Sequence, residues 1–145
     1  MLVRELTVQY RTRPDLPTYD AHILGAPREA AEFLRPILEN EPVEVFLVLC
    51  LTLKHRLLAY HELGRGTIDA VSVSPRDVFK IALLANAAAI AVAHNHPSGD
   101  PTPSPNDVAL TRTLAAGATL MGIQLVDHII LAESRYYSFK EGGHL

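Results

Sequence analysis

The sequence predicts a single α/β domain in which helices flank a curved, mixed β-sheet. Apolar, strand-like runs alternate along the chain with segments whose apolar residues recur at helical spacing. Such alternation is typical of an α/β fold. With 145 residues, of which 48% are hydrophobic, the chain is long enough for one buried core and too short for two ordinary domains.

The N-terminal part, residues 1–40, is expected to form a strand and a helix that pack on the core. Residues 6–10 alternate apolar and polar side chains, which predicts a short strand. Residues 27–39 place their apolar side chains on one side of a helix, and Pro36 inside this pattern should kink or shorten it. The main domain is expected over residues 41–145.

The middle of the chain predicts a β-hairpin followed by a short strand and a helix. Apolar runs indicate strands over about 44–53 and 56–63, which turn at residues 53–55. Residues 71–73 form a further short strand. A helix then begins after Ser74, which precedes a proline and a first-turn acid in the favoured order.

The C-terminal part predicts two more strands around a long helix, after an apolar run. This run, residues 87–93, carries no charged side chain, and its C-terminal part predicts a buried strand. A helix over 105–121 should end at Gly122. Strands are expected over 123–131 and 136–139.

Composition narrows the classes of protein. The net charge is −3 and the isoelectric point is about 6.1, so no overall basic field favours a nucleic-acid partner. The lone cysteine, Cys50, lies in an apolar strand and excludes an internal disulfide, which suits a reducing cytoplasm. No N-terminal signal pattern is present, and no apolar stretch reaches the roughly 20 residues that a membrane helix requires. We therefore expect a soluble cytoplasmic domain without a membrane partner.

The most informative segment begins at His94. His94 and His96 leave the same face of the C-terminal end of a strand, because strand side chains repeat with period two. Ser104 then predicts a helix N-cap, with Asp107 in the first turn. The two imidazoles and the carboxylate can converge on one point. Three such ligands with a vacant fourth position are typical of a catalytic zinc, which lowers the pKa of bound water to about 7.

Two other interpretations of these histidines stand beside metal binding. A pair of histidines at a strand end can be structural, or merely solvated near a loop. The aspartate at a helix start, after a loop rich in proline and glycine, favours metal binding. The letters His-Asn-His do not indicate an HNH nuclease, because that name describes residues dispersed over a ββα-metal unit.

The pattern HxHPSG followed by PSxxD resembles the JAMM (MPN+) metalloprotease motif, in the version found in bacterial RadC-like proteins. The resemblance covers about residues 41–145 and implies a JAB/MPN fold with a cytidine-deaminase-like architecture. Further matching segments are Gly66-Thr67, Val73–Asp77, Asn86-Ala87, Val126–Ile130, Tyr137–Phe139 and Glu141-Gly142.

The resemblance implies roles for five residues. In this family the two histidines and the aspartate hold zinc, here His94, His96 and Asp107. A glutamate on an early strand acts as general base on the attacking water and passes the proton to the leaving amine, a role that falls to Glu44. Ser104 helps to stabilise the oxyanion, and its alternative role is the helix N-cap, worth ~1 kcal/mol. The implied activity is zinc-dependent cleavage of a peptide or isopeptide bond, with a protein or peptide substrate held extended beside the metal.

Two assignments leave alternatives open. Only the resemblance selects Glu44 over Glu41 or Glu62, since a glutamate at a strand entrance is usually a solvated charge. Asp127 and His128 lie in a strand expected beside the one that carries the histidines. They form either a buried pair that holds strand ends together or a pair that orients a metal ligand.

The competing hypothesis is a non-catalytic module, associated with DNA repair or protein interaction, whose metal site is structural or vestigial. Negative net charge counts against autonomous DNA binding. A structural zinc site usually fills all four positions with protein and needs no spare base, so three ligands plus Glu44 favour chemistry. The substrate, the oligomeric state and the pathway stay open.

Overall fold

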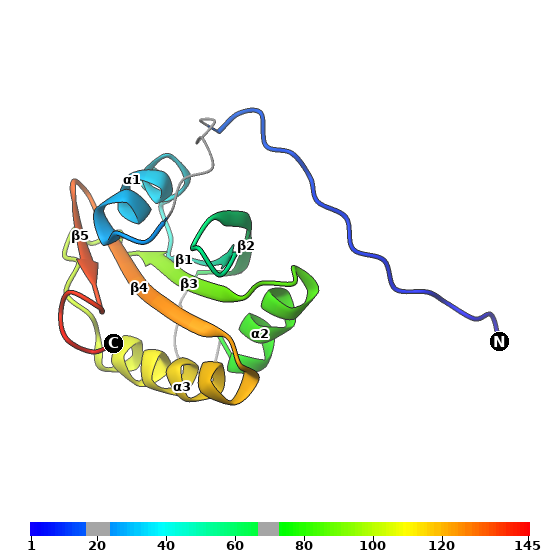
Figure 1. Cartoon of the computed structure of the whole chain (residues 1–145). Helices are drawn as coiled ribbons and strands as arrows, with labels where there is room; N and C mark the ends of the chain where they lie inside the picture. The colour runs from blue at the N-terminus through cyan, green and yellow to red at the C-terminus, as the bar shows by residue number, and fades with distance from the viewer. Residues whose placement is uncertain (17–23, 67–72) are drawn as a thin grey trace.

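The computed structural model describes residues 1–16, 24–66 and 73–145, and the following elements refer to those residues. Five strands form one sheet with the order β2-β1-β3-β4-β5 (Figure 1). In chain order the elements are α1 (Pro27–Leu38), β1 (Val45–Leu51), β2 (Leu57–Arg65), α2 (Pro75–Leu84), β3 (Ala89–Asn95), α3 (Pro105–Met121), β4 (Gln124–Ala132) and β5 (Arg135–Ser138).

The sheet is mixed, as the sequence predicts. β1 runs antiparallel to both β2 and β3, and β5 runs antiparallel to β4. β3 and β4 are parallel and are joined by α3, as a parallel pair requires a crossover connection. This crossover places the first turn of α3 near the C-terminal end of β3.

Apolar side chains form a layer on each face of the sheet. Odd-numbered residues of β1 and β3 pack with α1, and even-numbered residues of the same strands pack with α2 and α3. Figure 1 shows α1 on one face of the sheet and the other two helices on the opposite face. In β3 the even set includes Ile90 and Val92, and His94 continues it. Strand periodicity therefore directs the His94 side chain toward the face that α3 covers.

Three predicted helix termini are confirmed. The Ser74 side chain accepts a hydrogen bond from the backbone N–H of Asp77 at the start of α2. Ser104 caps α3 in the same way, and α3 ends at Gly122, whose φ of 67° is left-handed. α1 continues through Pro36 and ends two residues later at Leu38, so the proline does not stop the helix at that point.

The predicted N-terminal strand is wrong. Residues 1–13 belong to no helix or strand, and Figure 1 shows this segment as a drawn-out trace. Leu6, Val8 and Tyr10 remain 79%, 47% and 63% exposed. Alternation fits a strand only where a neighbouring strand supplies hydrogen bonds, and no such pairing forms here. Of the predicted strand at 71–73, Val73 lies outside any strand and the other two residues lie outside the described ranges.

None of the helices in the described ranges combines the length and the apolar content that crossing a membrane requires.

Cys50 should resist thiol reagents in the native protein. It belongs to the buried layer under α2 and α3, and burial raises the pKa of its thiol to about 11. At about pH 8 the reactive thiolate is then present in on the order of one molecule in a thousand. The native protein is expected to react very slowly with DTNB, and fully once denaturant is added. Cys50 is 1% exposed but also borders a cavity along β2, so rapid reaction of the native protein would mean that this cavity admits the reagent.

Candidate metal centre

Three side chains meet at the C-terminal end of β3. His94 is the penultimate residue of β3, His96 follows the strand directly, and Asp107 lies in the first turn of α3. The Nε2 atoms of the two histidines are 3.0 Å apart. Asp107 Oδ1 lies 3.2 Å from Nε2 of His94, and its Oδ2 lies 3.3 Å from Nε2 of His96. The structure therefore brings together the three ligands that the sequence predicts.

A capping box positions the carboxylate. The Ser104 hydroxyl accepts from the backbone N–H of Asp107 (3.1 Å), and Asp107 Oδ2 accepts from the backbone N–H of Ser104 (2.8 Å). Each residue thus satisfies an amide that the helix N-terminus leaves without an intrahelical partner. The helix-capping alternative for Ser104 is a feature of the structure, and the same contacts hold the Asp107 carboxylate toward the histidines.

The donor set fits a zinc ion. Zinc binds histidine nitrogen and carboxylate oxygen at about 2.0–2.2 Å in tetrahedral geometry, which separates neighbouring donor atoms by roughly 3.3 Å. The two Nε2 atoms are 3.0 Å apart, and each lies close to one oxygen of the Asp107 carboxylate, His94 at 3.2 Å from Oδ1 and His96 at 3.3 Å from Oδ2. His96 Nδ1 donates to the carbonyl oxygen of Asp100 at 2.8 Å, so in the neutral ring the Nε2 lone pair is directed at the centre. These three residues could therefore hold a metal ion.

The electrostatics keep the carboxylate ionised. Burial opposes the charged form of Asp107, but the close contacts of its carboxylate with His94 and His96, together with the hydrogen bond from the Ser104 N–H, outweigh burial and hold the pKa of the carboxyl far below its usual range. The pKa of His96 is raised, first by its close contact with the Asp107 carboxylate and further by the charge of Glu44, while burial opposes the shift. An ionised carboxylate is the form that binds a metal.

Glu44 lies beside the three donors. β1 pairs with β3 so that Phe46 stands opposite His94. Glu44 lies two residues before Phe46, and His96 lies two residues after His94, so the same antiparallel register, continued beyond the strand ends, sets Glu44 opposite His96 and on the same face. The half-buried carboxylate is close enough to raise the pKa of His96. The position agrees with the one that the family resemblance implies for the general base.

The two other candidate glutamates are engaged elsewhere. Arg65 donates to the carboxylates of both Glu41 and Glu62. This ion-pair cluster is largely exposed. The hydrogen bond from Arg65 lowers the pKa of Glu41. The geometry therefore separates Glu44 from the alternatives that the sequence alone leaves open.

Asp127 and His128 have different surroundings although they are adjacent in β4. The Asp127 carboxylate accepts from the Ser138 hydroxyl (2.6 Å) and from the backbone N–H groups of His128 (2.7 Å) and Lys140 (3.0 Å). It therefore ties β4 to the chain around the end of β5. His128 is fully buried, and its Nε2 lies 2.9 Å from Nδ1 of His94. Of the two residues, His128 hydrogen-bonds a candidate metal ligand, and the hydrogen bonds of the Asp127 carboxylate go to other groups.

Two residues of the site were missed by the sequence analysis. Thr111 lies within α3, and its Oγ1 is 2.6 Å from Nδ1 of His128. The spacing of four residues from Asp107 to Thr111, one helical turn, was an available signal. Asn95, between the two histidines, accepts from the backbone N–H of Val45 (2.7 Å). It points to the other face of β3 and holds the start of β1, next to Glu44.

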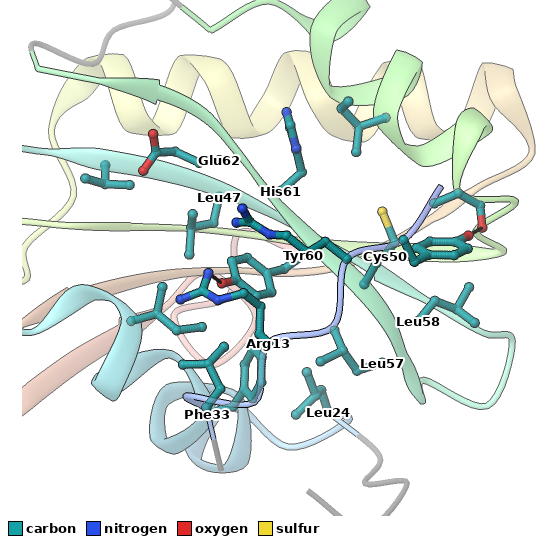
Figure 2. Close-up of a pocket in the computed structure, with 18 of the residues that line it drawn as sticks. Arg13, Leu24, Phe33, Leu47, Cys50, Leu57, Leu58, Tyr60, His61 and Glu62 are labelled. Atoms are coloured by element: carbon teal, nitrogen blue, oxygen red, sulfur yellow. Dashed lines mark hydrogen bonds between the residues drawn. The ribbon is translucent and has the colours of Figure 1, made fainter. Parts of the chain in front are cut away.

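A separate cavity of about 1080 Å³ lies along the outer strand β2. Figure 2 shows it with Arg13 of the N-terminal segment, Phe33 of α1 and Tyr60 of β2 among its lining residues. The Arg13 guanidinium donates to the Tyr60 hydroxyl. None of the three candidate metal ligands lines this cavity, so it is distinct from the metal centre.

Known relatives share this sequence over most of its length. A UPF0758 protein of Methylibium petroleiphilum is 46% identical over 123 residues, which are 85% of this chain and 55% of the relative. One of Thiobacillus denitrificans is 44% identical over 131 residues, 90% of this chain and 58% of the relative. One of Methanosarcina barkeri is 39% identical over 118 residues, 81% of this chain and 52% of the relative. The chain thus spans about half the length of the curated relatives that it matches.

A family model agrees with these relatives and with the motifs. The model described as the RadC-like JAB domain matches residues 24–144. The match begins earlier than residue 41, where the sequence resemblance starts, and so includes α1. It covers most of the chain, and the predicted family resemblance is confirmed. The chain belongs to the RadC-like JAB domain family.

Proposed function

We propose that this domain is a zinc-dependent hydrolase that uses water to cleave a peptide or isopeptide bond. One arrangement carries the proposal: the register of β1 on β3 brings Glu44 close enough to act on the pKa of His96, next to donors whose spacing fits zinc. Three such donors would leave one tetrahedral position open. A site that serves only structure needs no such carboxylate.

The chemistry divides among few groups. A bound zinc ion would polarise the scissile carbonyl and lower the pKa of a water molecule to about 7. His94, His96 and Asp107 would hold the ion. Glu44 would take the proton from the attacking water and deliver it to the leaving amine, as a general base and then a general acid.

Ser104 can serve both as cap and as oxyanion donor. A hydroxyl group carries one proton and two acceptor lone pairs. The capping bond from the Asp107 N–H uses a lone pair, and so the hydroxyl proton is available to stabilise negative charge that develops on the carbonyl oxygen. This assignment deepens the proposal and does not compete with the helix cap.

The substrate is proposed to be an extended polypeptide, in a cytoplasmic setting that the single, buried cysteine suits. The competing function is a binding module with a structural metal. The matched region makes up only about half of each relative, 55% and 52% of two of them, so the activity and the partners of a whole protein of this kind are part of the proposal.

The test is cleavage that depends on zinc. The purified domain, stripped with a chelator, is reloaded with one equivalent of zinc and incubated with a mixed peptide library and with isopeptide-linked peptides. Mass spectrometry is expected to find new peptide ends that appear with zinc and disappear with chelator. A folded domain that retains one zinc per chain and cleaves none of these bonds would favour the binding module.

A further inference from the structure

A continuous hydrogen-bond chain leads from His94 away from the candidate metal position. His94 Nδ1 lies 2.9 Å from His128 Nε2, His128 Nδ1 lies 2.6 Å from Thr111 Oγ1, and Thr111 Oγ1 lies 2.7 Å from the backbone carbonyl oxygen of Asp107. All three side chains are buried, at 1%, 0% and 2% exposure respectively. The chain begins at one candidate ligand and ends on the main chain of another.

We propose that Thr111 and His128 are positioning residues that set the tautomer of His94 so that its Nε2 offers a lone pair to a metal ion. The inference rests on the metal site of the proposed function and not on hydrolysis. The direction in which these hydrogen bonds donate follows from the last acceptor, the carbonyl oxygen of Asp107. A carbonyl oxygen has no proton and can only accept, so the single hydroxyl proton of Thr111 points to Asp107.

The remaining protons follow in order. Because the Thr111 hydroxyl has only lone pairs left, His128 Nδ1 must carry a proton and donate it. A neutral imidazole has one N–H, so Nε2 of His128 accepts. Nδ1 of His94 then carries the proton, and Nε2 of His94 is left bare. That atom is the one 3.2 Å from Asp107 Oδ1 and 3.0 Å from His96 Nε2.

The surroundings of His128 favour its neutral form. The ring stacks on Phe139, with centroids 4.6 Å apart and an interplanar angle of 11°, and packs edge-on against Phe46 at 5.8 Å. Its two nitrogens bond His94 and Thr111, so neither bonds a carboxylate. A charged His128 would donate from both nitrogens and reverse the tautomer of His94.

Both candidate histidine ligands are thereby oriented by a backbone carbonyl. His96 reaches one directly, since its Nδ1 donates to Asp100. His94 lies deeper in the sheet and reaches one through His128 and Thr111. Partners of this kind orient metal-bound histidines, and their removal typically weakens metal affinity by about 10–100-fold.

Thr111→Val tests the chain, because valine keeps the shape of the side chain and removes the hydroxyl. We expect zinc affinity, measured by competition with a chromogenic chelator, to fall about 10–100-fold. In the metal-free protein, long-range ¹H–¹⁵N correlation spectra of the histidine rings should show His94 protonated at Nδ1 in the wild type. In Thr111→Val the spectra should show loss of that single tautomer. Thr111→Ser restores the hydroxyl and should recover both properties.

Thr113→Val is the matched control. Thr113 lies on the same helix and, like Thr111, donates to the carbonyl oxygen four residues earlier, at 3.0 Å. Its side chain is exposed and belongs to no hydrogen bond of the series from His94 to Asp107. It should leave both properties unchanged. Unchanged affinity and tautomer in Thr111→Val, or equal losses in Thr111→Ser or Thr113→Val, would overturn the proposal. The tautomer spectra decide it even if the wild type cleaves no substrate, so the two proposals can fail separately.

Discussion

Replacing Asp107 with asparagine is expected to abolish tight zinc binding while leaving the fold in place. The amide keeps an oxygen that can accept from the Ser104 N–H, as the carboxylate does now, so the start of α3 persists. It removes the only carboxylate among the three donors, since the other two are imidazoles. The loss of affinity should exceed the roughly 10–100-fold typical of outer partners. Competition with a chelator, together with metal content after dialysis, measures it.

Thermal unfolding supplies a second measurement of the same variant. A metal that binds only the folded state stabilises it by about 2.7 kcal/mol at a free concentration of 100 Kd. For a chain of this size, that corresponds to a rise in Tm of roughly 5–10 °C. The wild type should show this rise on addition of zinc, and Asp107→Asn should not.

Asp100→Asn is the matched control for Asp107→Asn. It makes the same chemical change in the loop between the ligands, where the exposed Asp100 carboxylate accepts from the N–H and hydroxyl of Thr102. Its backbone carbonyl, which holds His96, is unaltered by the change. Wild-type affinity in Asp100→Asn and lost affinity in Asp107→Asn assign the effect to ligation. Equal losses in the two variants would point instead to a general effect of negative charge near the histidines.

Much of this site could be predicted because its signals are local. The two histidines share a face through strand periodicity. Ser104 indicates the start of a helix, and Asp107 lies three residues later, in its first turn. Both features depend on backbone geometry over a few residues. The arrangement of strand, loop and helix follows from the same short segment, and the structure agrees with it.

The features that were missed depend on contacts between distant segments. Glu44 reaches His96 through the register of β1 on β3, which no local pattern reveals; only the family resemblance pointed to it. Thr111 meets His128 because β4 lies beside β3. The alternation of Leu6, Val8 and Tyr10 predicted a strand, but these residues pair with no neighbouring strand and their side chains are exposed. Local patterns thus predict elements, while pairing decides which side chains meet.

Glu44→Gln is expected to leave zinc bound and to suppress hydrolysis. The amide is nearly the same size as the carboxylate but cannot take up a proton from the attacking water, and general acid–base groups typically contribute about 10²–10⁴-fold in rate. Glu44 is not one of the three clustered donors, so zinc affinity should stay within a few-fold of the wild type. The rate is measured as kcat/KM on a substrate from the library screen, and the metal content is measured in parallel.

Glu62→Gln is the control that gives this result its meaning. Glu62 is an exposed acid on the neighbouring strand β2 and pairs with Arg65, so its substitution should cost little in rate. Loss of zinc in Glu44→Gln would make the residue a fourth ligand and would remove the open position that hydrolysis requires. Full activity in Glu44→Gln would assign the proton transfer to another group. Zinc retention together with a slowed reaction is the one outcome that fits a carboxylate placed beside His96 to move a proton.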